Sequence, residues 1–405
     1  MACSWSMPVL AGPSDVTGSL QTGQGVRVLK LWGTPDQRGH AHGVLLGADL
    51  MKVFEGIVLD PRIVDSLPVY ESKVRRQLLG RFRFDPDYRA ELEGMLRGIV
   101  EAVGLEGTRL EKLGRHLDVR DLMALNCMAD WYPFACSSFS AWGPATADGQ
   151  MITARNLDFI PLPGLETDHV LIAYLEPGSG KLPWVSLAWP GLIGAYSAMN
   201  AGGVTVSMHD ASPLEPTHRG AFVPRSLALR DAIESARAGS AVADVKRVLL
   251  KCPTMFGNNI HVSSPYTGQA TPAAVFEYDG QLSKDGGVTQ RVASSSKGTS
   301  WLTCTNHYCR RADPPPVQDH PFSTVRRFTT LATALADAGR SQGKIDPAWA
   351  RSNLAKVATQ GDVLTLHTVY YLPNRKEMLI SLTQSGQPAT RFEPVRMTLA
   401  KLLRK

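Results

Sequence analysis

The sequence predicts an α+β protein in which a mostly helical first part precedes a mostly stranded second part. Between Pro68 and Val103, apolar residues recur at the spacing of amphipathic helices. From Cys136 onward, short runs of β-branched and aromatic residues are separated by turn residues, as in strands and hairpins. Because these strands do not alternate one by one with helices, the pattern favours antiparallel sheets over a βαβ fold.

The first part contains one predicted strand followed by several predicted helices. Residues 1–24 are rich in Gly, Ser and Pro and are expected to be irregular. Apolar and other side chains alternate over residues 25–32, which predicts a strand. A turn at residues 33–35 leads into a predicted helix, and residues 118–126 form a helix with its own cap.

The second part is predicted to consist mainly of strands. Asp148-Gly149 is a strong turn signal between two extended stretches, so residues 136–142 and 151–159 form a predicted hairpin. Further predicted strands span 170–175, 184–188, 203–208, 259–263, 273–278 and 299–304, and a last hairpin joins 364–372 to 377–383. Predicted helices span 224–252 with one break, a stretch that begins at 323, and 346–359.

Composition indicates a globular protein. The 405 residues allow one large domain or two ordinary ones, and a hydrophobic content of 43% is enough for a sizeable core. The net charge of +6 is scattered without a basic run, which argues against nucleic acid as a partner. No stretch reaches the roughly 18 apolar residues of a membrane span, and no signal peptide is visible. Localisation and a homo-oligomeric state stay open.

The cysteines and histidines outside the central cluster give weak signals. Six cysteines lack the spacing of a disulfide framework. Cys304, His307 and Cys309 resemble part of a zinc site, but three clustered residues without a fourth ligand favour it little. His40 and His42 are more typical of hydrogen-bonded structural histidines than of pocket residues. We therefore expect no metal and no organic cofactor.

A reactive site is predicted around Cys136. If residues 151–159 return beside this cysteine, Arg155 and Asp158 come close to its thiol. A neighbouring cation favours the thiolate and lowers the thiol pKa, so Cys136 is expected to be nucleophilic near neutral pH. The carboxylate can orient a second basic group. The cluster indicates a nucleophile without naming a reaction.

Five blocks of the chain occur in the order of a known family. They are Gly33-Thr34-Pro35 with Gly39 and Gly43, Cys136-Ser137-Ser138-Phe139, Arg155-Asn156-Leu157-Asp158, residues 191–203, and Thr305-Asn306-His307. Together they resemble the N-terminal-nucleophile (Ntn) hydrolases of the C45 peptidase and acyl-CoA:6-aminopenicillanic acid acyltransferase group. Choloylglycine hydrolases, penicillin V acylase and acid ceramidase are wider relatives of that group. Ala135 is a mild departure, because members often carry Gly before the cysteine.

The resemblance implies a four-layer αββα sandwich and a chain that cuts its own backbone between Ala135 and Cys136. Residues 1–135 would be a mostly helical pro-segment, and residues 136–405 would be the mature chain that carries the nucleophile. Both would stay together in one compact domain. The freed α-amino group of Cys136 would serve as general base for the thiol of the same residue.

Roles for further residues follow from the same resemblance. Arg155 would stabilise the thiolate, Asp158 would hold the α-amine, and Asn306 with a main-chain N–H would bind the oxyanion. Arg327 is the expected pocket arginine, with Arg326 as the alternative. The expected substrate-binding residues are Tyr196, Asn200, His209 and Asp210.

The implied activity is hydrolysis of a linear N-acyl amide, a small molecule, through a thioester. Three alternatives stay open. An acyltransferase would pass the acyl group to an amine instead of water. A Cys-His protease would pair Cys136 with His307 or His367 and would need no chain cleavage. A non-catalytic binding protein on the same scaffold would lose the cluster, and the intact cluster argues against it.

Overall fold

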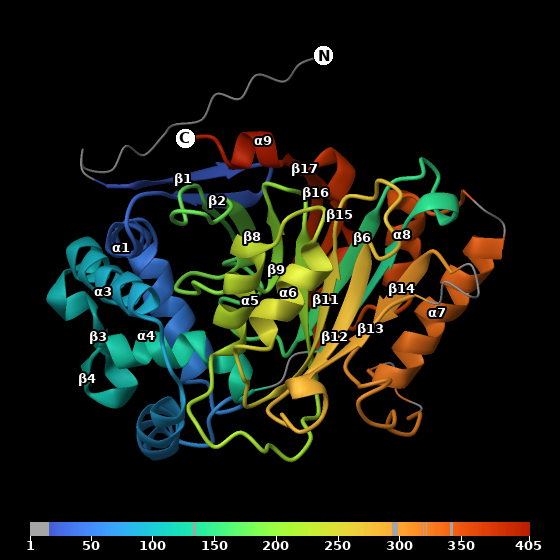
Figure 1. Cartoon of the computed structure of the whole chain (residues 1–405). Coiled ribbons are helices and arrows are strands. Elements are labelled where there is room, and N and C mark those ends of the chain that lie inside the picture. Colours follow the sequence, from blue (N-terminus) through green and yellow to red (C-terminus); the bar gives the residue numbers. More distant parts are fainter. Residues whose placement is uncertain (1–15, 133–134, 294–298, 319, 321, 341–342) are drawn as a thin grey trace.

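Two sheets lie face to face at the centre of the protein (Figure 1). This computed structural model describes residues 16–132, 135–293, 299–318, 320, 322–340 and 343–405. The larger sheet runs in the order β1 (Gly18–Gly23), β2 (Val26–Leu31), β7 (Val170–Tyr174), β8 (Trp184–Ala188), β9 (Ser197–Asn200), β10 (Thr205–Ala211), β11 (Gly257–Ser263), β12 (Ala273–Tyr278) and β13 (Val288–Arg291). The smaller runs β14 (Trp301–Cys304), β5 (Ala135–Ala141), β6 (Ile152–Phe159), β15 (Leu364–Leu372), β16 (Glu377–Leu382) and β17 (Val395–Thr398). Strands β3 (Arg109–Leu110) and β4 (Arg115–His116) pair separately.

Helices cover the outer face of each sheet. On the larger sheet lie α1 (Pro35–Val53), α3 (Pro86–Gly107), α4 (Val119–Asn126), α5 (Arg225–Ser235) and α6 (Ala241–Leu249). On the smaller sheet lie α7 (Thr324–Arg340) and α8 (Pro347–Ala355), which contact β14, β5 and β6. Short helices α2 (Leu67–Val69) and α9 (Leu399–Leu402) complete the set in the described residues. The predicted four-layer αββα sandwich is confirmed.

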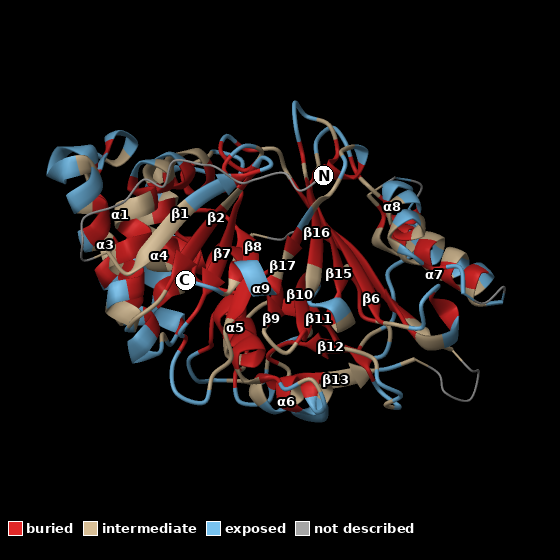
Figure 2. Ribbon diagram, turned by 90° about the horizontal axis from the view of Figure 1, so that it is seen from above, coloured by how far each residue is buried: buried red, intermediate tan, exposed pale blue. Residues whose placement is uncertain are grey.

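Alternation along the strands accounts for these layers. Val28, Leu171 and Leu187 of the larger sheet pack against Val369 and Ile380 of the smaller sheet. Residues one position along each strand face the helices instead, as the two-residue period of a strand requires. Burying each of these side chains stabilises the fold by about 1.5–3 kcal/mol. Figure 2 accordingly has buried strands in the middle and exposed outer faces on the helices.

The segment before Cys136 is built into the same sheet as the segment after it. Strand β2 pairs in parallel with β7, from Arg27 opposite Val170 to Leu31 opposite Tyr174. A buried ion pair also connects the two segments: Arg230 of α5 contacts Glu91 of α3 at 2.9 Å. The described residues before and after Cys136 therefore share one sheet and one core.

Most predicted elements are confirmed, and several short ones were missed. Residues 18–23 were expected to be irregular, and that expectation was wrong because they form β1. Gln24 (φ 51°) and Gly25 (φ 80°) turn this strand back onto β2. Strands β9, β13 and β17 were not predicted either. In β9, Ser-Ala-Met-Asn has little strand propensity, and pairing with both β8 and β10 makes it a strand.

Glycines let α1 and α3 cross in close contact. A Cβ atom added at Gly39 would lie 1.8 Å from the Glu91 carbonyl oxygen, and one at Gly98 would lie 2.1 Å from the His40 carbonyl oxygen. These obstacles are backbone atoms, so the helices themselves would have to separate. The family-like block around Gly39 and Gly43 thus serves helix packing.

We expect Gly39→Ala to lower the free energy of unfolding by about 3 kcal/mol, because the added methyl overpacks the helix crossing. Gly80→Ala is the matched control, since a Cβ there would meet no atom within 4 Å. Urea unfolding of both variants measures the difference. Equal midpoints for the two would contradict the close crossing.

Candidate active site

Cys136 lies on β5 with its side chain in the space between the two sheets. The direction follows from strand alternation: Ser138 and Ser140, on the same face, contact His261 of β11 at 2.7 and 2.9 Å. Phe139, on the opposite face, packs edge-on against Trp349 of α8, with ring centroids 5.6 Å apart. The Cys136 side chain is fully buried in the intact chain.

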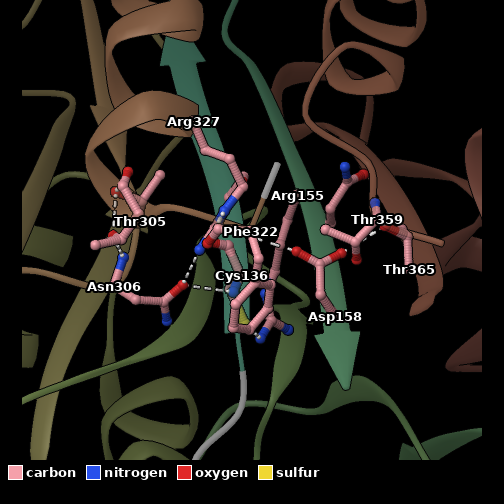
Figure 3. A network of polar contacts seen from close by, with 12 residues as sticks. Cys136, Arg155, Asp158, Thr305, Asn306, Phe322, Arg327, Thr359 and Thr365 are labelled. Carbon is pink, nitrogen blue, oxygen red and sulfur yellow. Dashed lines mark hydrogen bonds and ion pairs between the residues drawn. The ribbon is translucent and has the colours of Figure 1, made fainter. Parts of the chain in front are cut away.

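Arg155 is the hydrogen-bond partner of the thiol. Strand β6 pairs with β5, and the Arg155 Nη2 atom lies 3.1 Å from Cys136 Sγ (Figure 3). The larger sheet holds the guanidinium from the other side: Nη1 donates to the Tyr196 carbonyl at 2.9 Å and Nη2 to the Met208 carbonyl at 2.7 Å. The predicted hairpin thus brings a fixed cation to the thiol.

The expectation of a thiolate near neutral pH was wrong for the intact chain. Burial raises the pKa of the Cys136 thiol to about 11, and this effect exceeds the opposing attraction of Arg155. Asp158 and Asp210 act in the same direction as burial. The thiolate loses the hydration of a full charge inside the sandwich, and one guanidinium does not replace it.

The backbone N–H of Cys136 is held by Asn306. It donates to the Asn306 Oδ1 atom at 2.8 Å, and the Asn306 Nδ2 atom donates to the Asp210 carbonyl at 2.8 Å. Asn306 is the second residue after the end of β14, and its own N–H donates to the Thr324 hydroxyl at 2.8 Å. The start of α7 and the end of β14 together place this amide beside Cys136.

Arg327 of α7 holds the carbonyl side of the same residue. Its Nη1 atom donates to the Cys136 carbonyl at 2.6 Å and to the Ser137 hydroxyl at 2.7 Å, while Nη2 reaches Asn306 Oδ1 at 2.9 Å. Arg327 is buried, whereas Arg326 is exposed on the outer side of α7. The structure thus brings Arg327, and not Arg326, to Cys136.

Asp158 lies on the outer face of β6, opposite Ala135 in the strand pairing. Its Oδ1 atom accepts a hydrogen bond of 2.6 Å from the Thr365 hydroxyl, and Oδ2 lies 3.9 Å from the Arg327 Nη1 atom (Figure 3). Burial raises the pKa of Asp158 to about 6, against the attraction of Arg327 and the hydrogen bond from Thr365. The group therefore titrates just below neutral pH.

A pocket of about 400 Å³ opens from solvent toward the bond between Ala135 and Cys136. Its apolar walls include Pro213, Phe256 and Phe322, and Ala135 itself lines it. Asp210, Asn306 and Arg327 supply its polar atoms. In the intact chain Ala135 therefore stands between the pocket and the buried thiol.

The four predicted substrate-binding residues lie in different settings. The Tyr196 carbonyl accepts from Arg155, and the Asp210 carboxylate pairs with the Arg225 Nη1 atom at 2.6 Å. The His209 ring is buried, with Nδ1 3.3 Å from the Asn259 carbonyl.

Asn200 is not brought to Cys136. Its side-chain amide donates to the Ile233 and Ala236 carbonyls, both at 2.8 Å, and accepts from the Gly202 and Val204 N–H groups. These bonds close the turn between β9 and β10 onto the end of α5. We therefore assign Asn200 to the fold and leave it out of the site.

The histidines of the protease alternative do not contact the thiol in the described residues. His307 Nδ1 lies 2.9 Å from the Thr324 hydroxyl, and His367 Nε2 lies 2.9 Å from the Ser197 hydroxyl. His42 accepts a hydrogen bond from the Gly191 N–H at 3.0 Å, and His40 pairs with Glu101. His40 and His42 thus form hydrogen bonds of the structural kind expected from the sequence.

No metal-binding cluster of three or more suitable side chains occurs in the residues that the structure describes. The Cys304 thiol contacts the Thr305 carbonyl at 3.6 Å instead. Within the same residues, no helix is both long and apolar enough to cross a membrane.

Sequence analysis assigned no role to three hydroxyl residues that contact site side chains, namely Ser137, Ser197 and Thr365. Ser137 and Ser197 do lie inside family-like blocks, 136–139 and 191–203. Hydroxyl residues are common in strands, and nothing in the spacing distinguishes Thr365.

No protein-family model matches the chain. An uncharacterised protein from Archaeoglobus fulgidus is 26% identical over 215 residues, which are 46% of this chain and 33% of that protein. The match thus spans about a third of that relative's length.

Several solved structures are similar to the fold described above. An orthologue of N-acylethanolamine-hydrolysing acid amidase from Caenorhabditis elegans has 17% identity and a TM-score of 0.43, covering 65% of this chain and 100% of its own. A conjugated bile acid hydrolase from Clostridium perfringens has 13% identity and a TM-score of 0.46, covering 66% and 94%. Penicillin V acylase from Agrobacterium tumefaciens has 13% identity and a TM-score of 0.43, covering 66% and 87%.

Proposed function

We propose that this chain is an autoprocessed cysteine amidohydrolase of the Ntn type, which cleaves a linear N-acyl amide. One observation carries the proposal: separate side chains contact the thiol, the backbone N–H and the carbonyl of Cys136, namely Arg155, Asn306 and Arg327. A cysteine that serves only the core needs none of these contacts. A residue whose own amide bond is cut, and whose N and S atoms then react together, needs its backbone held as firmly as its thiol.

Self-cleavage is the first proposed step. The Cys136 sulfur attacks the carbonyl carbon of Ala135, a C–S bond forms, and the bond from that carbon to the Cys136 nitrogen breaks. The thiol proton ends on the released nitrogen, which becomes the α-amine. Water then cleaves the thioester, which leaves a carboxylate on Ala135 and restores the thiol. Ala135 lines the pocket in the uncut chain, so a shift of its new carboxylate after cleavage would open the pocket to the thiol.

Turnover repeats this chemistry on a small-molecule amide. The α-amine of Cys136 takes the thiol proton as sulfur attacks the substrate carbonyl, and passes it to the leaving amine. Water resolves the thioester to the free acid. Arg155 would support the thiolate, Asp158 would hold the α-amine, and Asn306 would donate to the oxyanion. The support for Arg155 is its contact with the thiol. The support for Asp158 is its place opposite Ala135 in the strand pairing. The support for Asn306 is its contact with the Cys136 N–H and its place in the pocket wall.

After cleavage the two pieces are proposed to remain one body. Strand β2 of the first piece pairs with β7 of the second, and the Glu91–Arg230 ion pair also joins them. The apolar pocket walls favour an uncharged acyl group.

The direct test is the state of freshly purified wild-type protein. We expect pieces of 135 and 270 residues under denaturing conditions, the larger beginning at Cys136, and a single particle under native conditions. Release of amine from a panel of N-acyl amides then measures turnover. An active preparation that remains one uncut chain would rule out the Ntn mechanism, while cut protein that transfers the acyl group to low concentrations of added amine would be an acyltransferase.

A further inference from the structure

We propose that Ser197 and His367 act together as positioning residues that hold Arg155 against the thiol of Cys136. The proposal rests on the proposed function, in which Arg155 supports the thiolate. Ser197 lies on β9 of the larger sheet and His367 on β15 of the smaller sheet, so the pair bridges the two sheets beside the site.

The Ser197 hydroxyl lies between Arg155 and His367. The Arg155 Nη1 atom contacts its oxygen, and the His367 Nε2 atom lies 2.9 Å away. A guanidinium can only donate hydrogen bonds, so the serine oxygen accepts from Arg155. The hydroxyl also forms a hydrogen bond with His367 Nε2. This second bond fixes the position of the serine oxygen that accepts from the guanidinium.

His367 suits this role because it stays neutral. It is fully buried and packs against Trp189 and His169, with ring centroids 5.7 and 5.4 Å away. Burial, followed by the nearby His169 and Arg155, holds the pKa of His367 well below its usual range. A neutral imidazole has one donor and one acceptor nitrogen. The ring therefore holds Ser197 without taking up a proton and adds no positive charge next to Arg155.

A bulge in β15 makes the arrangement geometrically attainable. Thr365 and His367 are two residues apart and would face the same side of a regular strand. The pairing with β6 shifts between them, so that Thr365 lies opposite Asp158 and His367 lies opposite Leu157. Thr365 consequently reaches Asp158 on the outer face, while His367 points between the sheets to Ser197. One extra residue, Leu366, lets a single strand serve both sides of the site.

Arg155 needs this support because it is the contact that favours the thiolate. The charged groups near the thiol are Arg155 and Asp158 from β6, Asp210 from β10 and Arg327 from α7. Of these, Arg155 is the one that contacts Sγ, and both carboxylates oppose ionisation of the thiol. A guanidinium that rotates away would leave the thiol with burial and two carboxylates. A change at Ser197 that lets the Arg155 guanidinium move is therefore expected to raise the pKa of the Cys136 thiol.

The test measures the pKa of the Cys136 thiol in wild type, Ser197→Ala, His367→Leu and His367→Gln. Thiolate absorbance in the ultraviolet is followed against pH, and the signal of the matching Cys136→Ala protein is subtracted to isolate Cys136. We expect Ser197→Ala and His367→Leu to raise the thiol pKa by about one unit. They should lower kcat/KM for amide release by about 10-fold or more. His367→Gln keeps a side chain that can hydrogen-bond to Ser197 and should restore most of both values.

His261→Gln is the matched control. His261 is also a buried histidine that bridges the two sheets through serines, but it contacts Ser138 and Ser140 instead of Ser197. We expect the pKa of the Cys136 thiol in His261→Gln to equal that in wild type. Thermal unfolding identifies any variant that fails to fold, in which case Ser197→Thr and His367→Asn provide milder changes for the same measurement.

The outcomes separate this proposal from the proposed function. An unchanged thiol pKa in folded Ser197→Ala and His367→Leu overturns the positioning role, even if kcat/KM falls. A shift of equal size in His261→Gln overturns it as well. N-terminal sequencing of wild type tests autoprocessing on its own, and the thiol pKa can be measured on cut or uncut chain. Failure of one proposal is therefore distinguishable from failure of the other.

Discussion

Cys136→Ala is expected to purify as one uncut chain of 405 residues with no measurable amide hydrolysis. The sulfur is the proposed attacking atom in both self-cleavage and turnover, so its removal stops both. The fold should survive, because a methyl group replaces a thiol in a buried strand whose partners are β6 and β14. Denaturing electrophoresis and intact mass report the cleavage, and thermal unfolding reports the fold.

Cys252→Ala is the control for this prediction. Burial also raises the pKa of the Cys252 thiol to about 11, so the two cysteines start from the same acidity in the intact chain. No guanidinium contact to Cys252 corresponds to the Arg155 contact at Cys136 in the described residues. Cys252→Ala should be cut and active like wild type. Cleavage that persists in Cys136→Ala would show that another group performs it.

Asp158→Asn is expected to lower kcat/KM by about 100-fold or more, in line with the contribution of a general acid–base partner. The substitution keeps the size of the side chain and the acceptor for Thr365, but removes the charge proposed to hold the α-amine of Cys136. Processed protein with an N-terminal Cys136 is the sample to measure. Turnover close to wild type in such a sample would remove Asp158 from the mechanism.

The same group predicts an acid limb in the pH profile. Burial raises the pKa of Asp158 to about 6 in the uncut chain, and the α-amine freed by processing should lower it from there. Turnover should fall as pH drops through the resulting value and the carboxylate gains a proton. Thr365→Val removes the donor to the carboxylate and should move the limb to higher pH. Stability should change in the opposite direction: because the folded-state pKa lies above the ordinary value of 3.8, protonation near pH 6 favours the folded state.

The local parts of the site could be predicted from sequence alone. The Asp148-Gly149 turn and the alternation on either side of it indicated a hairpin, and the structure has that hairpin as β5 and β6. Arg155 comes to the thiol because hairpin pairing depends on nearby residues. The helical first part, the late hairpin β15–β16 and the capped helix α4 likewise follow from short-range patterns.

Other parts were decided by tertiary structure because their causes lie far apart in the chain. Asn306 and Arg327 reach Cys136 across 170 and 191 positions, and spacing cannot give such a distance without the family resemblance. Asn200 belongs to a family-like block, yet its amide is used in a turn. Strand β9 exists because two neighbours pair with it.

The pKa of the Cys136 thiol separates most clearly what the local sequence predicts from what the tertiary structure determines. The sequence by itself determined that a cation would lie beside the thiol, and that alone predicts a lowered pKa. The tertiary structure decided the direction of the pKa shift, which is upward. Both sheets together remove the thiol from water, and burial outweighs the contact with Arg155. Contacts between strand neighbours follow from local sequence, whereas desolvation is a sum over everything that packs around an atom.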